Sequence, residues 1–239
     1  MRHLKTYRTR GFARYAAGLL AAASILVAAP PASGDLVLRL TSGATQVTVT
    51  DGGSDDSCGL VGCVTFVGPV SNSFLLNVVT GTSHPLLPAT PFLASMSLTS
   101  VIIGNAVGVL VIELTDTDFP ATDAGFFSVD SSGTTQGNVS LSAHKNVSNE
   151  EFDTTSSIAV DLGASGGTLA GSDSTLHGPL GTYSMTLRAV VTHGIGGTTV
   201  ASLNASNASS ASVPEPSTLV VLGLGLFGVG AMERRRTRN

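Results

Sequence analysis

Tryptophan is absent from this chain of 239 residues, and aromatic side chains of all kinds make up only 5% of it. Trp often supplies the flat surface on which sugars and nucleic-acid bases stack, so its absence disfavours a dedicated carbohydrate-binding face. A hydrophobic core must therefore be built from Val, Leu, Ile and a few Phe residues.

Basic residues are nearly missing from the middle of the chain. Between residues 35 and 212 only Arg39, Lys145 and Arg188 stand against 14 acidic residues, a formal charge of −11. The net charge of −4 for the whole chain hides this imbalance, because the other basic residues lie at the two ends. Binding to nucleic acids or anionic membranes draws on cationic side chains, so the composition argues against both as partners of this segment. It is compatible with solubility outside the cell, or with divalent cations.

The N-terminal segment is typical of a secretion signal. Its first 14 residues include five basic ones, Arg2, Lys5, Arg8, Arg10 and Arg14. An apolar stretch follows over residues 16–29, and Ala32-Ser33-Gly34 has the small-x-small pattern of a leader-peptidase site. We predict that residues 1–34 are a signal peptide, cleaved after Gly34. The segment has no adjacent Arg-Arg pair, which favours general secretion over the twin-arginine route.

The C-terminal segment has three parts that make sense together at a membrane. Pro214 and Pro216 fix φ near −65° and lack N–H donors, so Pro214-Glu215-Pro216 should stay extended. The apolar run that follows covers residues 219–232, shorter than the roughly 20 residues needed to cross a hydrocarbon core unaided. Its four glycines let a partner helix approach closely. The basic residues Arg234, Arg235, Arg236 and Arg238 end the chain and predict a cytoplasmic stop.

This order of parts resembles the PEP-CTERM sorting signal of Gram-negative bacteria, in which a Pro-Glu-Pro box precedes a hydrophobic helix and an Arg-rich tail. The resemblance covers residues 213–239 and implies processing by an exosortase, a membrane-embedded transpeptidase-like enzyme. It implies that Pro214, Glu215 and Pro216 are the sorting recognition residues, and that Arg234, Arg235 and Arg236 are the membrane stop. The protein would then be anchored transiently in the inner membrane by a short transmembrane sorting helix, and delivered to the cell surface or extracellular matrix.

Between the two signals the sequence is typical of β-structure. Runs rich in Val, Thr, Leu and Ile alternate with gaps containing Gly, Pro, Ser, Asn or Asp, as turns require. The expected strands are residues 36–40, 45–50, 64–67, 74–80, 96–103, 107–114, 138–142, 157–162, 182–193 and 198–203. We predict an all-β fold, with one antiparallel β-sandwich or jelly-roll-like domain over 35–203 and a flexible Asn/Ala/Ser-rich tether over 204–212.

One tempting catalytic motif is Gly163-Ala164-Ser165-Gly166-Gly167, which fits the G-x-S-x-G nucleophile pattern and is followed by Asp173 and His177. That motif requires a strand leading into a helix, and residues 168–173 have neither the length nor the period of a helix. We therefore expect a Gly/Ser loop that holds all three residues. A G-x-G-x-x-G match over 223–228 lies in the apolar C-terminal segment, with no β-α-β unit around it.

Cysteines and acidic clusters are the remaining chemical candidates. Cys58 and Cys63 are the only cysteines, and in an exported chain they predict a disulfide that closes a small loop. A zinc site would need further ligands, and no His lies near them in the sequence. The clusters 51–56 and 116–123 could offer carboxylates to Ca²⁺, but neither fits an EF-hand, and solvated turn acids are the preferred interpretation. We predict no catalytic residues, no metal site and no cofactor.

The sequence therefore predicts an exported, acidic β-protein sorted by an exosortase. We expect a structural, non-enzymatic role at the cell surface, with exopolysaccharide as the expected partner and no nucleic acid bound. Two alternatives stay open: a carbohydrate- or calcium-dependent adhesive module, and a secreted hydrolase that uses Ser165 or paired acids.

Overall fold

The alternation of apolar and polar residues in the sequence becomes an alternation of buried and exposed side chains along β-strands. The computed structural model describes residues 34–159, 162–194 and 196–209. Within these ranges all regular elements are strands, and no helix is long and apolar enough to cross a membrane. The predicted signal peptide up to residue 33, the sorting residues Pro214–Pro216 and the basic residues Arg234–Arg236 lie outside the described residues.

Twelve strands make up the domain, and all their pairings are antiparallel. They are β1 (Val37–Ser42), β2 (Thr45–Thr50), β3 (Cys63–Ser71), β4 (Phe74–Thr82), β5 (Ala89–Thr90), β6 (Leu93–Gly104), β7 (Gly108–Phe119), β8 (Gly125–Asn146), β9 (Ser157–Ala159), β10 (Ala164–His177), β11 (Tyr183–His193) and β12 (Gly197–Ser209).

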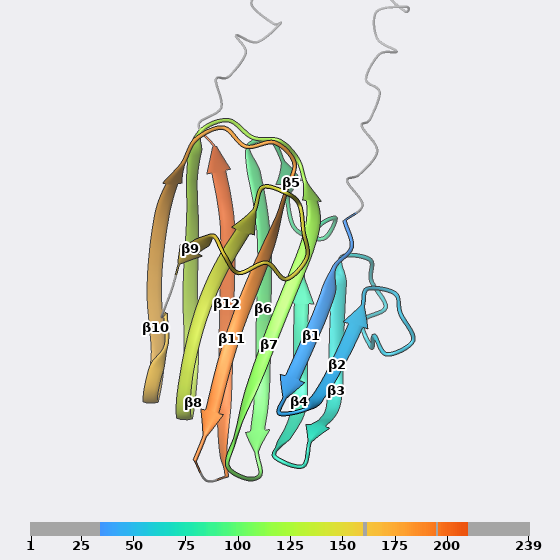
Figure 1. The fold of residues 1–239 in the computed structure, drawn as a ribbon, viewed down its shortest axis with the longest axis vertical. Coiled ribbons are helices and arrows are strands. Elements are labelled where there is room, and N and C mark those ends of the chain that lie inside the picture. The colour runs from blue at the N-terminus through green and yellow to red at the C-terminus, as the bar shows by residue number, and fades with distance from the viewer. Residues whose placement is uncertain (1–33, 160–161, 195, 210–239) are drawn as a thin grey trace, which may run out of the picture. The chain divides into compact units, whose positions relative to one another are not determined.

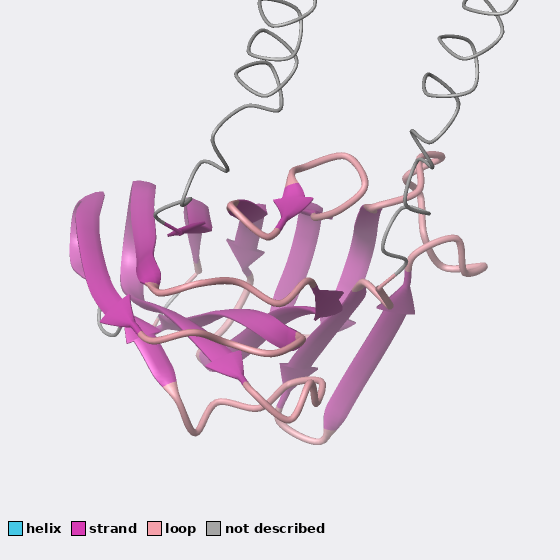
Figure 2. Ribbon diagram, turned by 90° about the horizontal axis from the view of Figure 1, so that it is seen from above, coloured by secondary structure: helices cyan, strands magenta, loops and turns pink. Residues whose placement is uncertain are grey.

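The strands form two layers packed face to face (Figures 1 and 2). Layer A has the order β2-β1-β7-β11 and continues into the second half of β8, which also pairs with β9. Layer B has the order β10, first half of β8, β12, β6, β4 and β3, with β5 beside β6. The predicted all-β antiparallel sandwich is therefore confirmed.

Strand β8 belongs to both layers because it bends sharply near Gln136 and Gly137. Residues 125–135 pair with β12, whereas residues 138–146 pair with β11. The bend needs glycine: a Cβ at Gly137 would overlap the carbonyl oxygen of Thr192, and Gly133 has φ +146°, which disfavours other residues. This bend closes one side of the sandwich.

The two ends of the sandwich differ. We call the end at which Gly34 and Ser209 lie the terminal end, and the opposite one the hairpin end (Figure 1). Long connections such as 51–62, 83–88 and 147–156 lie at the terminal end, whereas tight turns lie at the hairpin end. The core lies between the layers and is formed by aliphatic side chains with a few large rings, among them Phe74, Phe119, Phe127 and Tyr183.

Two expectations from the sequence were wrong. Residues 204–209 of the predicted tether (204–212) are no tether, because β12 continues in register between β6 and β8 up to Ser209, whereas 210–212 lie outside the described residues. The region around Ser165 is no loop, because it opens the 14-residue strand β10. Residues 204–209 are rich in Asn, Ala and Ser, and β10 is rich in Ser and Gly, so both have low strand propensity. Residues 204–209 become a strand by pairing with β6 and β8, and β10 becomes one by pairing with β8.

Candidate functional site

The outer face of layer B is covered by short polar side chains. In-register residues on neighbouring strands point to the same face, so β10, β8, β12 and β6 line up their outward residues in rows. From the terminal end these rows are Ser174-Ser128-Ser206-Ser95, then Ser172-Asp130-Asn204-Ser97, then Ala170-Ser132-Ser202-Thr99. All twelve side chains are exposed or half-buried. We call these three rows the hydroxyl face.

The hydroxyl face is a grid of hydrogen-bonding groups with a short repeat. Neighbouring strands lie about 4.8 Å apart, and outward residues along one strand about 7 Å apart. A few of these groups bond to each other: Ser97 Oγ donates to Asn204 Oδ1 at 2.6 Å, and the hydroxyls of Thr99 and Ser202 are 3.5 Å apart. Hydroxyls both donate and accept, so the face can match the mixed donors and acceptors of another hydroxyl-rich molecule.

Asp130 is the one charged side chain in these three rows. It is exposed near the middle of the face, between Ser172 on β10 and Asn204 on β12, and it makes no hydrogen bond or ion pair with other described residues. A hollow of about 350 Å³ lies beside it, lined also by Ser95, Ser97 and, from the 83–88 connection, Leu87. A carboxylate accepts charge-assisted hydrogen bonds that are roughly twice as strong as neutral ones. Asp130 is therefore the strongest polar anchor on the face.

An apolar row borders the hydroxyl face at the terminal end. Leu176, Phe126, Ala208 and Leu93 are in register across β10, β8, β12 and β6. Three of them are well exposed, with relative accessibilities of 83% for Leu176, 45% for Phe126 and 41% for Leu93. The outer side of layer B thus offers a polar grid and, next to it, an apolar strip that includes one aromatic ring.

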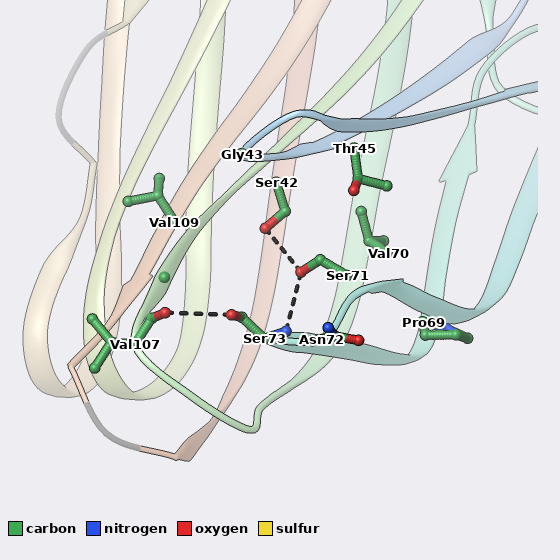
Figure 3. Close-up of a pocket in the computed structure, with 11 residues that line it drawn as sticks. Ser42, Gly43, Thr45, Pro69, Val70, Ser71, Asn72, Ser73, Val107 and Val109 are labelled. Carbon is green, nitrogen blue, oxygen red and sulfur yellow. Dashed lines mark hydrogen bonds between the residues drawn. The ribbon is translucent and has the colours of Figure 1, made fainter.

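A second hollow, of about 770 Å³, lies at the hairpin end between the turns of three hairpins (Figure 3). Ser71 Oγ donates to Ser42 Oγ at 3.0 Å, and Ser73 Oγ donates to the carbonyl oxygen of Val107 at 3.3 Å. Its described lining consists of Ser, Thr, Asn, Pro, Gly and Val residues, without a titratable side chain. This hollow can bind neutral groups, but its lining supplies no acid, base or charged nucleophile.

The structure separates the residues of the G-x-S-x-G motif. Ser165 and His177 lie at opposite ends of β10, twelve residues or about 40 Å apart along the strand. Ser165 Oγ donates to Asn138 Oδ1 at 2.6 Å, and the Oδ1 atom of Asp173 accepts from the N–H of Ser174. His177 is buried against Asn207, with Nε2 2.8 Å from Asn207 Oδ1. These three residues therefore do not form a catalytic triad.

The two cysteines are joined in a disulfide, and the neighbouring acids organise its loop. Asp56 Oδ1 accepts the N–H groups of Cys58 and Thr65, both at 2.8 Å, and Asp51 Oδ2 accepts the N–H of Gly62 at 2.6 Å. The first acidic cluster thus satisfies backbone donors of its own loop.

The second acidic cluster is split between the interior and the surface. Asp116 is buried beside His84, whereas Asp118 is exposed and accepts from Asn149 Nδ2 at 2.7 Å. Among the residues that the structure describes, no group of three or more His, Cys, Asp or Glu side chains is arranged to hold a metal ion.

Sequence reasoning missed the hydroxyl face. Its signal was present in the alternation of Ser, Thr and Asn with apolar residues over 94–99 and 201–206, but which strands stand side by side depends on the register. Asp130 gave no signal at all, because nothing in the sequence around it marks it as central.

Comparisons with known proteins identify a sorting motif in the C-terminal segment. Residues 212–236 match the family model of the PEP-CTERM protein-sorting motif. No curated protein sequence matches the chain. The C-terminal segment therefore carries a PEP-CTERM sorting motif, which implies exosortase processing and export to the cell envelope or surface.

Solved structures that are similar to this chain include two with low sequence identity. The K1 cleaved adhesin domain of Lys-gingipain from Porphyromonas gingivalis W83 is similar at 9% identity and a TM-score of 0.32, over 72% of this chain and 99% of that domain. The enzymatically active domain of tailspike protein 4 from bacteriophage CBA120 is similar at 11% identity and a TM-score of 0.30, over 54% of this chain but only 18% of that one. Neither likeness carries an argument about function.

Proposed function

We propose that this is an exosortase-sorted surface or matrix protein whose body binds a neutral polysaccharide through the hydroxyl face. By the body we mean the segment between the two signals, residues 35–212. The observation that carries the proposal is the three-row grid of Ser, Thr and Asn side chains around Asp130 on the outside of layer B. In this proposal the body is a binding module. The separation of Ser165 from His177 argues against the version of the hydrolase alternative that uses Ser165.

The chemistry of the face supports a sugar polymer over other polar ligands. Sugars present hydroxyls that donate and accept, as the side chains of the face do. Neighbouring sugar hydroxyls can donate to the two oxygens of Asp130, which lacks a protein partner among the described residues. A grid that extends over four strands offers repeated, similar sites, which suits a long polymer more than a single small molecule.

The apolar row supplies the apolar contacts that sugar recognition needs besides hydrogen bonds. Sugar rings have apolar C–H surfaces that pack on exposed aromatic and aliphatic side chains. Phe126, Leu176 and Leu93 lie next to the first row of the hydroxyl face, so a chain lying on the face can reach them. This strip supplies an apolar contact in a chain that has no Trp.

The negative charge of the body favours an uncharged polysaccharide as the ligand. The segment between the two signals carries a formal charge of −11, so an anionic polysaccharide would be repelled. Lys145 and the two arginines of the body contribute nothing to the hydroxyl face, because its three rows contain no basic residue.

Titration calorimetry of the exported protein with neutral and acidic fractions of the host's exopolysaccharide tests this proposal. We expect heat of binding with the neutral fraction, and about tenfold weaker binding by the Asp130→Asn variant, which loses charge-assisted bonds. Asp173→Asn is the matched control, since it removes the same charge from the next strand, on the side opposite the hydroxyl face. Absence of binding to the neutral fraction, or equal loss in both variants, would refute the proposal.

Sorting itself rests on residues outside the described ranges. We further propose that Pro214, Glu215 and Pro216 are recognised by the exosortase, while Arg234, Arg235 and Arg236 hold the short apolar segment in the inner membrane until it is removed. Intact-mass measurement of the protein from its host tests this step. A mature mass that still includes residues 219–239 would contradict it.

A further inference from the structure

We propose that Gly34 is retained in the exported protein, where it closes a buried site formed by His84 and Asp116, and that the leader peptidase cuts on the N-terminal side of Gly34. This differs from the cleavage after Gly34 that the Ala32-Ser33-Gly34 pattern predicts. The site lies at the terminal end, just before β1, and it shares no residue with the hydroxyl face.

His84 and Asp116 form a buried pair under the first residues of the body. His84 Nδ1 lies 3.0 Å from Asp116 Oδ2, and the two side chains are 2% and 0% exposed. The N–H of Gly34 donates to the other ring nitrogen, His84 Nε2, at 3.0 Å. Because Nε2 accepts this bond, the ring proton is on Nδ1, which lies close to Asp116 Oδ2 but does not form a hydrogen bond with it. The bond from the backbone N–H of Gly34 is therefore the hydrogen bond that holds the buried imidazole ring.

The fit around Gly34 admits no side chain. A Cβ at this position would overlap the carbonyl oxygen of Thr117 and Asp116 Oδ1, and would lie 2.8 Å from His84 Cε1. The N–H of the next residue, Asp35, donates to Thr117 Oγ1 at 3.3 Å. The backbone at 34–35 is thus bonded to β7 through Thr117 and to the 83–88 connection through His84.

Removal of Gly34 would leave this site incomplete. His84 Nε2 would be a buried acceptor without its donor, next to a space that the glycine had filled. Unsatisfied buried polar groups are rare in folded proteins because water compensates them only when it can enter. A site shaped around one glycine indicates that the folded protein keeps this glycine.

The variant Gly34→Ala, exported and purified from the host as the complete natural protein, separates the two cleavage positions. If Gly34 is retained, the variant protein is heavier by one methylene group, and the forced Cβ lowers its melting temperature by roughly 3–10 °C. If Gly34 is removed with the leader, Ala at the last leader position is still cleaved, and the mature variant is identical to the wild type in mass and stability.

Gly59→Ala is the control, because a Cβ at Gly59 has no atom within 4 Å. We expect this control to melt within about 2 °C of the wild type. N-terminal peptide sequencing of the wild-type protein supplies the direct measurement. A mature chain that begins at Asp35, or a Gly34→Ala variant of unchanged mass, overturns the proposal.

Discussion

Asn207 provides the sharpest test of the fold, because the sequence predicts a tether there and the structure places it in the interior. Its side chain is 2% exposed on β12. Asn207 Nδ2 donates to the hydroxyl oxygen of Tyr183 at 2.9 Å, and Asn207 Oδ1 lies 2.8 Å from His177 Nε2. One amide therefore connects β12 to β11 and to the end of β10.

The substitution Asn207→Ala removes both hydrogen bonds and leaves buried polar atoms on Tyr183 and His177 without these partners. Each unsatisfied buried group costs about 1–3 kcal/mol, so we expect the free energy of unfolding to fall by about 3 kcal/mol. For a domain of this size that is a decrease in melting temperature of roughly 6–12 °C. Urea unfolding followed by circular dichroism measures the free energy directly, provided that the slope with denaturant is unchanged.

Asn204→Ala is the matched control on the same strand. Asn204 points outward on the hydroxyl face and only accepts a hydrogen bond from Ser97, so its loss should change the free energy of unfolding by no more than about 0.5 kcal/mol. In a flexible tether both substitutions would be neutral. Equal stabilities of the two variants would therefore refute the placement of β12.

Three further results are expected. Burial raises the pKa of Tyr183 to about 12. The phenol of the unfolded chain therefore loses its proton at a lower pH than that of the folded protein, and the free energy of unfolding decreases from pH 10 to pH 12. Measurements of this free energy over a pH series should show the decrease in the wild type and not in Tyr183→Phe. Glu113→Gln removes the carboxylate that both arginines of the body contact, at 2.7 and 3.4 Å, and should lower the free energy of unfolding by about 1 kcal/mol at low salt and by less at high salt. Reduction of the disulfide between Cys58 and Cys63 should cost about 2 kcal/mol, because the closed loop is short; calorimetry with and without reductant measures it, and complete unfolding would contradict it.

Strands with strong local patterns could be predicted well. The run at 45–50 was predicted with the bounds that β2 has, and the runs at 74–80 and 182–193 differ from β4 and β11 by one or two residues at their ends. Val and Thr alternate in β2, and β11 is rich in apolar residues, so the period and the propensity agree with the pairing partners. The local sequence of these strands is therefore sufficient to predict them.

Strand β10 and the first half of β8 could not be predicted in the same way. Both are rich in Gly and Ser, and their local propensity favours turns. They are strands because each satisfies the backbone hydrogen bonds of the other, from Gly125 with His177 to Thr135 with Gly167. A partner more than 30 residues away in the sequence makes that choice, so no local pattern reports it.

The hydroxyl face shows the same limit for function. Each of its residues is an ordinary polar position in the sequence, and Asp130 resembles any turn acid. Register brings Ser172, Asp130, Asn204 and Ser97 from four separate strands into one row. A shift of one residue in any of these strands would turn its hydroxyls inward.

The sequence by itself determined the β class of the body, its acidic charge and the sorting motif near its C-terminus, because composition, period and short motifs are local properties. Only the tertiary structure decided that residues 204–209 belong to a strand within a sheet, that the residues of the G-x-S-x-G motif are dispersed, and that Gly34 fits against His84 and Asp116. They depend on contacts between residues far apart in the sequence, from Ala164 with Val139 to Ala208 with Leu93. Their energies depend on burial and hydrogen-bond geometry, which exist only once the strands have been paired.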